Sequence, residues 1–236
     1  SEGVPPFGPM FPETFDADLQ APLVDEFGDF GDPGMMFDPS FGVGFVGWTQ
    51  VAAPASRGLV MIRGVLEAEI DVFGDSMAVG SIHALRYYLP GIRVDGKSNR
   101  QWSAAPKYVA AKGDSLRRAV VIVLGTNAGT DLPVARKTLD AIGPDRMVVL
   151  TTVHGRFARA EEDNAALREL VKGRPNVRLA DWDAALKGTS GQLQSDGIHP
   201  SLKGSHLFAK TVRQALADLS EERTGKTVVL KELPGP

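Results

Sequence analysis

The sequence predicts an α/β protein in which helices cover both faces of a doubly wound parallel sheet, a three-layer architecture. Apolar, β-branched segments alternate with segments of helical periodicity, which is the pattern of βαβ units. The most apolar segment, Ala119–Leu124, is an unbroken hydrophobic run, as expected of a parallel strand that is buried on both sides. Polar residues directly follow several of these segments, at the edge where such sheets bind ligands.

Six segments are expected as strands because they are short, apolar and rich in β-branched residues. The second of them runs straight into Gly74-Asp75-Ser76, so these polar residues are expected at the end of a strand. In chain order the expected strands are Leu59–Ile62, Glu67–Phe73, Ile92–Val94, Ala119–Leu124, Met147–Val153 and Val177–Ala180.

Four longer segments are expected as helices because apolar residues recur along them every three or four positions. In the first, Val79, Ile82, Leu85 and Leu89 share one face, and Pro90-Gly91 ends the pattern. The expected helices are Ser76–Leu89, Leu132–Ile142, Ala160–Lys172 and Leu202–Leu219.

Residues 1–56 differ from the rest of the chain in charge and composition. They carry nine of the 29 acidic residues and none of the 26 lysines and arginines, together with eight prolines and eight phenylalanines. A disordered linker is poor in aromatic residues, so we expect Phe27–Trp48 to pack on the domain, with a solvated tether as the alternative. The expected division is an acidic Phe/Pro-rich linker or N-terminal extension at 1–56, an α/β domain at 57–222 and a C-terminal tail at 223–236.

The composition argues against several kinds of chemistry. A net charge of -3 gives no reason to expect a nucleic-acid partner. Because the chain has no cysteine, it has neither a disulfide nor a thiolate nucleophile. The glycines form no G-x-x-x-x-G-K-[ST] phosphate loop, and His, Asp and Glu show no metal-ligand spacing, so we expect neither a cofactor nor a metal.

Ser76 stands where a strand is expected to pass into a helix. In the first turn of a helix the backbone N–H groups are unpaired, and the helix dipole favours negative charge. A serine at this position exposes its Oγ as a nucleophile, while its own N–H helps to hold an oxyanion. The alternative is a simple helix cap, because Asp75 and Ser76 are both good N-cap residues.

His199 follows Asp196 by three residues, in a turn-forming segment that ends at Pro200. A serine hydroxyl is a poor nucleophile unless a neighbouring base removes its proton, and that base needs an orienting carboxylate. Asp196 and His199 supply both functions from one turn. The alternative is a surface turn in which Asp196 only stabilises the loop.

Asn127 follows the most hydrophobic expected strand, so its side chain is expected at the same edge as Ser76. A side-chain amide donates a hydrogen bond to an oxyanion without titrating, and in a known case this is worth ~3 kcal/mol of the barrier. The alternative is turn formation within Thr126-Asn127-Ala128-Gly129.

These islands resemble the first, third and fifth sequence blocks of the SGNH (GDSL-type) hydrolase superfamily. The matching residues are Gly74-Asp75-Ser76, Gly125-Thr126-Asn127 and Asp196-Gly197-Ile198-His199, and the match spans Asp71–Leu219. The forms GDSMAVGS, VDGKSNRQ, VIVLGTNAG and DGIHPSLKG are most similar to the extracytoplasmic SGNH domains that follow integral-membrane acyltransferase domains, as in peptidoglycan O-acetyltransferases.

The resemblance implies a flavodoxin-like SGNH hydrolase fold, with 57–222 as the catalytic domain. It also implies a triad of Ser76, His199 and Asp196. The oxyanion hole would contain the Ser76 N–H, the Asn127 amide and a second-block N–H. The superfamily usually has glycine at that last position, which here corresponds to Asn99, or alternatively to Ser98.

The resemblance further implies a serine-dependent O-acyl transferase or esterase domain, with acetyl as the expected acyl group. It would act on a cell-envelope glycan or glycolipid through an acyl-serine intermediate. The implied partners are an acetyl ester, delivered by a fused membrane acyltransferase domain, and the glycan or glycolipid acceptor. The implied location is extracytoplasmic, tethered to a membrane domain outside this chain. A free-standing secreted carbohydrate or lipid esterase and a non-catalytic glycan-binding SGNH-like module remain as alternatives.

Several residues outside the three islands are weaker candidates. His154-Gly155-Arg156 follows an expected strand at the same edge, so it either contacts a carbohydrate acceptor or caps the sheet. Specificity is expected to depend on Lys97–Lys112 and Thr126–Leu132, both taken as loops. The residues for which packing or a surface position is expected over ligand contact are His83, His206, Trp48, Trp102 and Trp182.

Overall fold

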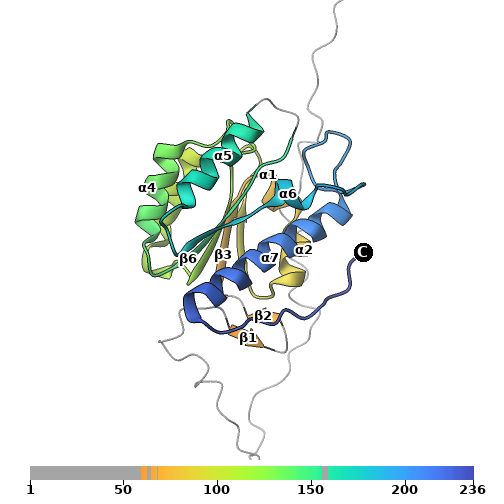
Figure 1. Ribbon diagram of the computed structural model, residues 1–236. Coiled ribbons are helices and arrows are strands. Elements are labelled where there is room, and N and C mark those ends of the chain that lie inside the picture. The colour runs from red at the N-terminus through yellow and green to blue at the C-terminus, as the bar shows by residue number, and fades with distance from the viewer. Residues whose placement is uncertain (1–59, 63–64, 68, 156–158) are drawn as a thin grey trace, which may run out of the picture. The chain divides into compact units, whose positions relative to one another are not determined.

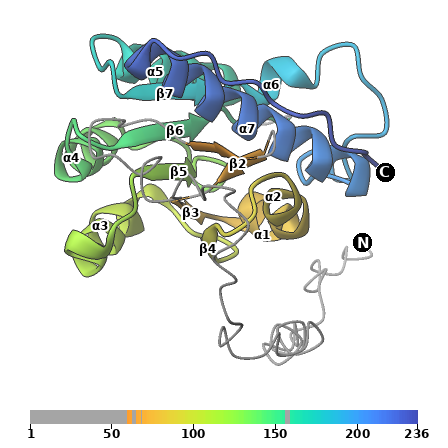
Figure 2. The ribbon, with the colours of Figure 1, turned by 90° about the horizontal axis from the view of Figure 1, so that it is seen from below.

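A five-stranded parallel sheet forms the centre of the protein, which confirms the predicted α/β fold. The computed structural model describes residues 60–62, 65–67, 69–155 and 159–236, so the Phe-rich segment Phe27–Trp48 lies outside the described residues. The strands lie in the order β4-β3-β5-β6-β7, which can be followed in Figure 2, a view from below that of Figure 1. They are β3 (Ile70–Gly74), β4 (Arg93–Gly96), β5 (Ala119–Val123), β6 (Met147–Thr151) and β7 (Val177–Ala180).

The strand order reverses at β3, and this reversal positions the site. The chain leaves β3 to form β4 on one side and returns to form β5 on the other, both parallel to β3. At such a switch point the two connections leave the carboxyl ends of neighbouring strands in opposite directions, so a crevice opens between them. The segments that follow β3 and β5 therefore begin at one edge of the sheet, and they carry Ser76, at the start of α1 (Ser76–Gly80), and Asn127.

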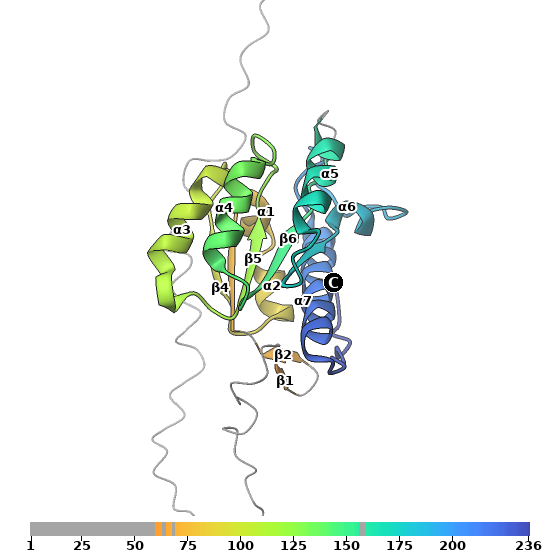
Figure 3. The same ribbon diagram turned by 60° about the vertical axis from the view of Figure 1, so that its left-hand side comes forward.

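Helices cover both faces of the sheet, which gives the three predicted layers (Figures 1 and 3). Along β5, Val121 and Val123 join one apolar cluster while Val120 and Ile122 join the other, as the two-residue period of a strand requires. The first cluster includes residues of α1 (Ser76–Gly80), α2 (Ile82–Tyr88) and α7 (Leu202–Thr224), and Trp182 of α6 (Trp182–Ala185). The second includes residues of α3 (Ala105–Lys112), α4 (Leu132–Ile142) and α5 (Ala160–Val171).

The helix predicted at Ser76–Leu89 is two helices, α1 and α2, separated at Ser81. Ser81 has φ -109° and ψ 5°, outside the helical region, and its N–H donates to the carbonyl of Ala78 at 3.3 Å. A hydrogen bond from an N–H to the carbonyl three residues earlier is of the 3₁₀ type, and it tightens the end of a helix. Gly80 directly precedes the break, and glycine is among the weakest helix formers.

The strand predicted at Glu67–Phe73 is also divided. Its first residue ends β2 (Val65–Glu67), which pairs antiparallel with β1 (Val60–Ile62), whereas Ile70 begins β3 of the parallel sheet. All five residues of β3 are buried, while Glu69 before it is exposed. The alternating apolar pattern continues across the point where the strand pairing changes. The pattern alone therefore does not reveal the division.

Lys97–Lys112, expected as a loop, contains a 3₁₀ turn at Trp102–Ala104 and then helix α3, so that expectation is wrong. A second 3₁₀ turn, at Gly113–Ser115, follows α3. Trp102, Tyr108 and Val109 of this segment are buried in the second apolar cluster. Tertiary packing thus makes a helix where the sequence lacks a clear amphipathic period.

The last helix, α7, runs to Thr224, five residues beyond its predicted end at Leu219. The following residues run back alongside α7 (Figure 2), and Val228, Leu230 and Leu233 pack against the first apolar cluster. The Arg213 guanidinium also donates to the carbonyl oxygen of Lys231 at 2.9 Å. Among the described residues, no helix combines the length and hydropathy that crossing a bilayer requires.

Candidate active site

Ser76 is the first residue of α1, directly after β3, as the sequence predicts. The N-cap of this helix is Asp75, whose Oδ1 accepts a hydrogen bond from the Met77 N–H at 2.9 Å. Because Asp75 caps the helix, the Ser76 hydroxyl is left for another partner. The tight turn needs glycine at position 74, since a Cβ there would lie 2.5 Å from the Cβ of Ala78.

The structure brings Ser76, His199 and Asp196 together. His199 Nε2 lies 2.9 Å from Ser76 Oγ, although the two residues are 123 positions apart in the chain. His199 Nδ1 lies 2.6 Å from Asp196 Oδ2, and Asp196 Oδ1 accepts the backbone N–H groups of Ile198 and His199 at 2.9 and 3.0 Å. One carboxylate therefore holds both the loop and the imidazole ring.

The protonation of these groups follows from their contacts. Burial acts to raise the pKa of Asp196, but the hydrogen bonds from the His199 ring and from the Ile198 and His199 N–H groups outweigh it, so this pKa lies below its ordinary value. The carboxylate is therefore ionised at neutral pH and accepts the proton on Nδ1. In this tautomer Nε2 is unprotonated and accepts the hydrogen bond from the Ser76 hydroxyl, which is the geometry of a serine and its general base.

Asn127 lies in the loop after β5, at the same edge of the sheet. Its Nδ2 lies 3.3 Å from Asp75 Oδ2 and 3.5 Å from the carbonyl oxygen of Arg100. Both distances exceed those of a strong N–H···O bond, so the Asn127 amide is available to donate to a better acceptor. The structure thus places a neutral donor beside the residue that precedes Ser76.

Asp75 has a second role that the sequence interpretation missed, because it treated this residue only as a helix cap. Its side chain is fully buried, and this burial raises its pKa to about 6. The hydrogen bonds from the Met77 N–H and the Asn127 amide act in the opposite direction without cancelling the effect. A carboxyl group that titrates near pH 6 therefore lies between Ser76 and Asn127 in the site.

Asn99 has a backbone φ of 60°, in the left-handed region that glycine and asparagine tolerate best. The turn around it is attached to the sheet, because the Lys97 N–H donates to the carbonyl of Gly74 at 3.0 Å and the Arg100 N–H to that of Lys97 at 3.2 Å. Among the described residues, no hydrogen bond joins Asn99 or Ser98 to Ser76. The left-handed conformation nevertheless matches a position at which glycine is usual.

The weaker candidates are either buried in the core, located on the helices or outside the described residues. Trp102 and Trp182 are each only 1% exposed and belong to the core, as expected, so they have no face on which a sugar could stack. His206 lies 3.2 Å from the Tyr88 hydroxyl on the helical face, and His83 is exposed on α2. Trp48 and Arg156 lie outside the described residues.

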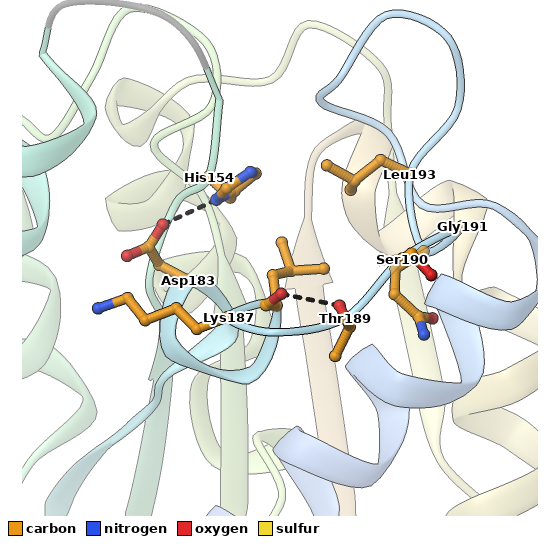
Figure 4. Close-up of a pocket in the computed structure, with 9 residues that line it drawn as sticks. His154, Asp183, Lys187, Thr189, Ser190, Gly191 and Leu193 are labelled. Atoms are coloured by element: carbon orange, nitrogen blue, oxygen red, sulfur yellow. Dashed lines mark hydrogen bonds and ion pairs between the residues drawn. The ribbon is translucent and has the colours of Figure 1, made fainter.

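His154 forms a contact that the sequence interpretation missed. It follows β6, and its Nδ1 lies 2.7 Å from Oδ1 of Asp183, a residue of α6. The only sequence signal for this pair is that both residues follow predicted strands, whose adjacency the sequence does not specify. The two side chains line a cavity, which Figure 4 shows.

The sequence is similar to those of several curated bacterial proteins, although no protein-family model matches it. A Staphylococcus aureus (strain MSSA476) protein named "Putative O-acetyltransferase" is 28% identical over 148 residues, which are 61% of this chain and 24% of that protein. The Bacillus subtilis (strain 168) "Putative peptidoglycan O-acetyltransferase YrhL" is 27% identical over 153 residues, 63% of this chain and 24% of that protein. The chain thus spans about a quarter of the length of the curated relatives it matches.

Solved structures share the fold. The C-terminal catalytic domain of peptidoglycan O-acetyltransferase A of Streptococcus pneumoniae superposes with a TM-score of 0.58 at 23% identity, covering 70% of this chain and 99% of that one. The family 3 carbohydrate esterase of Clostridium thermocellum has a TM-score of 0.52 at 14% identity, covering 66% of this chain and 98% of that one. A protein titled a putative GDSL-like lipase, from Parabacteroides merdae, also has this fold, with a TM-score of 0.50 at 17% identity, covering 69% of this chain and 99% of that one. The predicted resemblance is therefore confirmed in the fold, and the sequence is similar to proteins named as putative O-acetyltransferases.

Proposed function

We propose that this chain is the serine-dependent catalytic domain of an O-acyltransferase, which moves acetyl groups onto a glycan or glycolipid of the cell envelope. The single observation that supports it most is the continuous contact from Asp196 through His199 to Ser76, at 2.6 and 2.9 Å. A similar fold in a peptidoglycan O-acetyltransferase catalytic domain supports the choice of acetyl group and acceptor.

In the first half-reaction, Ser76 Oγ attacks the acyl carbonyl carbon of the donor while its proton passes to His199 Nε2. Asp196 stabilises the imidazolium that results. The oxyanion forms within reach of three donors, the Ser76 N–H, the Asn127 amide and the Asn99 N–H. When the intermediate collapses, the bond to the donor alcohol breaks, and His199 returns the proton to the departing oxygen. The product is an acyl ester of Ser76.

In the second half-reaction an acceptor hydroxyl replaces the donor alcohol. His199 removes the proton of the acceptor hydroxyl, and the acceptor oxygen forms a bond with the acyl carbon. The ester bond to Ser76 then breaks, and His199 returns the proton to Ser76 Oγ, which restores the free serine. If the acceptor is a sugar hydroxyl, the result is transfer, whereas with water it is hydrolysis. The triad can deprotonate a sugar hydroxyl or water in the same way. The binding of the acceptor therefore decides between transfer and hydrolysis.

The proposal also includes the location of the domain and the source of the acetyl group. The chain spans 24% of each of the two relatives, whose names describe O-acetyltransferases, so the other parts of such a protein are available to supply the acetyl group. We place the domain outside the cytoplasm, tethered to a membrane domain that delivers an acetyl ester. The 1–56 segment then acts as linker or extension and 57–222 as the catalytic domain.

Two alternatives make different predictions. A free-standing secreted esterase would use the same triad with water as its acceptor, and the similar fold of a carbohydrate esterase keeps this candidate in view. A non-catalytic glycan-binding module would not need a base within 2.9 Å of the serine, so the contact between His199 and Ser76 weighs against it.

Replacement of Ser76 tests the proposal. We expect Ser76→Ala to abolish the release of 4-nitrophenol from 4-nitrophenyl acetate by the full chain. Ser103→Ala, which changes an exposed serine of the 3₁₀ turn, is the matched control and should retain the wild-type rate. Retained turnover in a folded Ser76→Ala variant would show that Ser76 is not the nucleophile. The proposed function would then be wrong.

A further inference from the structure

A cavity of about 330 Å³ lies at the carboxyl edge of the sheet, outside the contacts of Ser76, His199 and Asp196. Its volume is at the lower end of the range of ~300–1,000 Å³ that is typical of small-molecule sites. Figure 4 shows His154 and Asp183 on one side of the cavity and Leu193 and Ser190 on the other. The lining therefore combines polar groups with apolar surface, and Leu186 adds to the latter.

The polar side of the cavity is held in a fixed position. Asp183 lies in the first turn of α6, and its backbone N–H donates to Thr152 Oγ1 at 3.0 Å. The same hydroxyl donates to Asp181 Oδ1, the N-cap residue of α6, at 3.0 Å. Asp183 Oδ1 then holds His154 Nδ1 at 2.7 Å, so the orientation of the imidazole is set by the ends of β6 and β7.

This arrangement leaves hydrogen-bonding capacity for a ligand. When Nδ1 of His154 donates to Asp183, its Nε2 is an acceptor, and no described residue bonds to it. Asp183 Oδ2 is likewise an acceptor without a hydrogen bond from a described residue. Both side chains are partly exposed, at 31% and 29%. Two acceptors thus face solvent on one side of a cavity whose other side carries leucine side chains.

The cavity is connected to the proposed general base by a short antiparallel ribbon. Leu193, which lines the cavity, forms a β-bridge with Pro200, the residue after His199. The N–H of Gln194 donates to the carbonyl oxygen of His199 at 2.8 Å, and the Ser201 N–H donates to that of Gln192 at 2.8 Å. One wall of the cavity is therefore formed by the segment whose backbone pairs with His199–Ser201, so a molecule bound there contacts the segment that supports the base.

We propose that this cavity binds a sugar unit of the acceptor glycan, an inference that rests on the proposed function. Sugar hydroxyls donate hydrogen bonds to His154 Nε2 and Asp183 Oδ2, while Leu186 and Leu193 contact the C–H face of the ring. A bound sugar places a neighbouring hydroxyl of the same chain near His199. That hydroxyl gives its proton to Nε2 of His199, and its oxygen forms the new ester bond. The bond to Ser76 breaks, and His199 returns the proton to Ser76 Oγ. The cavity thereby favours the glycan over water as acceptor.

Saccharide binding by the full chain tests the inference without requiring turnover. The probes are pentamers of β-1,4-linked N-acetylglucosamine and of β-1,4-linked glucose, titrated calorimetrically into Ser76→Ala. Binding of at least one pentamer is expected. In that background His154→Ala or Asp183→Ala should raise its Kd by about tenfold, as the loss of a hydrogen bond to the ligand predicts. His83→Gln, an exposed histidine on α2, is the control and should leave the Kd unchanged.

Three outcomes would overturn the inference: no binding of either pentamer, an unchanged Kd in both cavity variants, or equal weakening in the His83→Gln control. His154→Gln provides a second variant if His154→Ala fails to fold. With 4-nitrophenyl acetate as donor, the cavity variants in an intact Ser76 background should lower the ratio of pentamer acetylation to hydrolysis by about tenfold. A role in folding alone would lower both rates and leave the ratio unchanged, whereas failure of the proposed function would appear as turnover by Ser76→Ala.

Discussion

Oδ2 of Asp75 lies 3.3 Å from Nδ2 of Asn127, so the residue before the proposed nucleophile contacts the proposed oxyanion donor. The contact joins the loops after β3 and β5, the two strands between which the sheet order changes. It favours the amide orientation in which Nδ2 faces Asp75, because the carboxylate accepts a hydrogen bond only from Nδ2 and repels the amide oxygen. If Asn127 is an oxyanion donor as proposed, its amide is oriented by Asp75 before substrate binds.

Removal of the Asn127 amide should weaken the chemical step. We expect Asn127→Ala to lower kcat for a small acetate ester by ~10²–10³-fold, the effect typical of one oxyanion-hole donor. KM should change little, because this bond is stronger in the transition state than in the ground state. Steady-state kinetics on the purified chain measures both parameters. Asn99→Gly is the contrasting variant, since it keeps the backbone N–H and accommodates the φ of 60°, and its kcat should be retained.

Loss of the Asp196 charge should disable the base. In Asp196→Asn the amide can present an N–H to His199 Nδ1, which favours the tautomer with the proton on Nε2, where it opposes Ser76. The comparable change in a serine protease lowers kcat ~10⁴-fold, and we expect a decrease of ~10³-fold or more here. Stopped-flow measurement of nitrophenol release gives the acylation rate directly. A decrease of less than about tenfold would mean that Asp196 only supports the loop.

Asp75 should make stability depend on pH in a defined direction. Its pKa is about 6 in the folded protein and near 3.8 in the unfolded chain, so between these values the unfolded chain releases a proton that the folded protein keeps. Stability therefore decreases as pH rises through this window, by up to about 3 kcal/mol for a shift of about 2 pKa units. In Asp75→Asn this loss is absent, so the free energy of unfolding of the variant, relative to wild type, should increase from pH 4 to pH 7.

Urea unfolding at pH 4, 5, 6 and 7 measures this difference. Asp75→Asn also alters the hydrogen bond to Asn127, which lowers stability by an amount that does not depend on pH. The prediction therefore concerns only the direction in which the stability difference between variant and wild type changes with pH. A difference between variant and wild type that stays constant over these pH values would show that Asp75 does not titrate in this range.

Arg93 should stabilise the sheet through the buried carboxylate of Asp71. Its Nε and Nη2 donate to Oδ1 and Oδ2 of Asp71 at 2.6 and 2.7 Å, and the side chain of Asp71 is fully buried. Burial acts to raise the pKa of Asp71, but the Arg93 and Arg117 bonds outweigh it and hold that pKa below its ordinary value. Arg93→Ala would leave a buried charge without its main partner, at a cost of about 3 kcal/mol in the free energy of unfolding.

The control for this change is Lys172→Ala, which removes an ion pair with Glu169 in which both side chains are more than 60% exposed. Exposed pairs of this kind contribute less than about 1 kcal/mol. Urea denaturation at pH 7 compares the two variants. Equal stability of Arg93→Ala and Lys172→Ala would indicate that Asp71 finds another partner when Arg93 is removed.

The sequence predicts the parts of the protein that depend on local pattern. β5, β7 and α4 were expected at or within one residue of their observed bounds, because unbroken β-branched runs and an amphipathic period identify them. The juxtaposition of Ser76 and His199 was expected from the resemblance to a known family. Local pattern alone placed Ser76 at the end of a strand and His199 in a turn with Asp196.

The parts that depend on long-range contacts were not predicted. Helix α3 forms where Tyr108 stacks on Phe73 of β3, with ring centroids 4.2 Å apart, and no local pattern reveals that partner. The pairing of His154 with Asp183 likewise depends on β6 and β7 being neighbours, which only the completed sheet determines. Asp75 has one local bond, to Met77, and one distant bond, to Asn127, and the sequence indicates only the first.

The most direct test of the central claim, that His199 activates Ser76 as the nucleophile, is labelling with a fluorophosphonate followed by peptide mass spectrometry. In wild type we expect a single adduct, located on Ser76, and its rate of formation should fall by ~10²-fold or more in His199→Gln. Absence of an adduct in the folded wild-type chain, or labelling of Ser76 that is equally fast without the imidazole, would contradict the account.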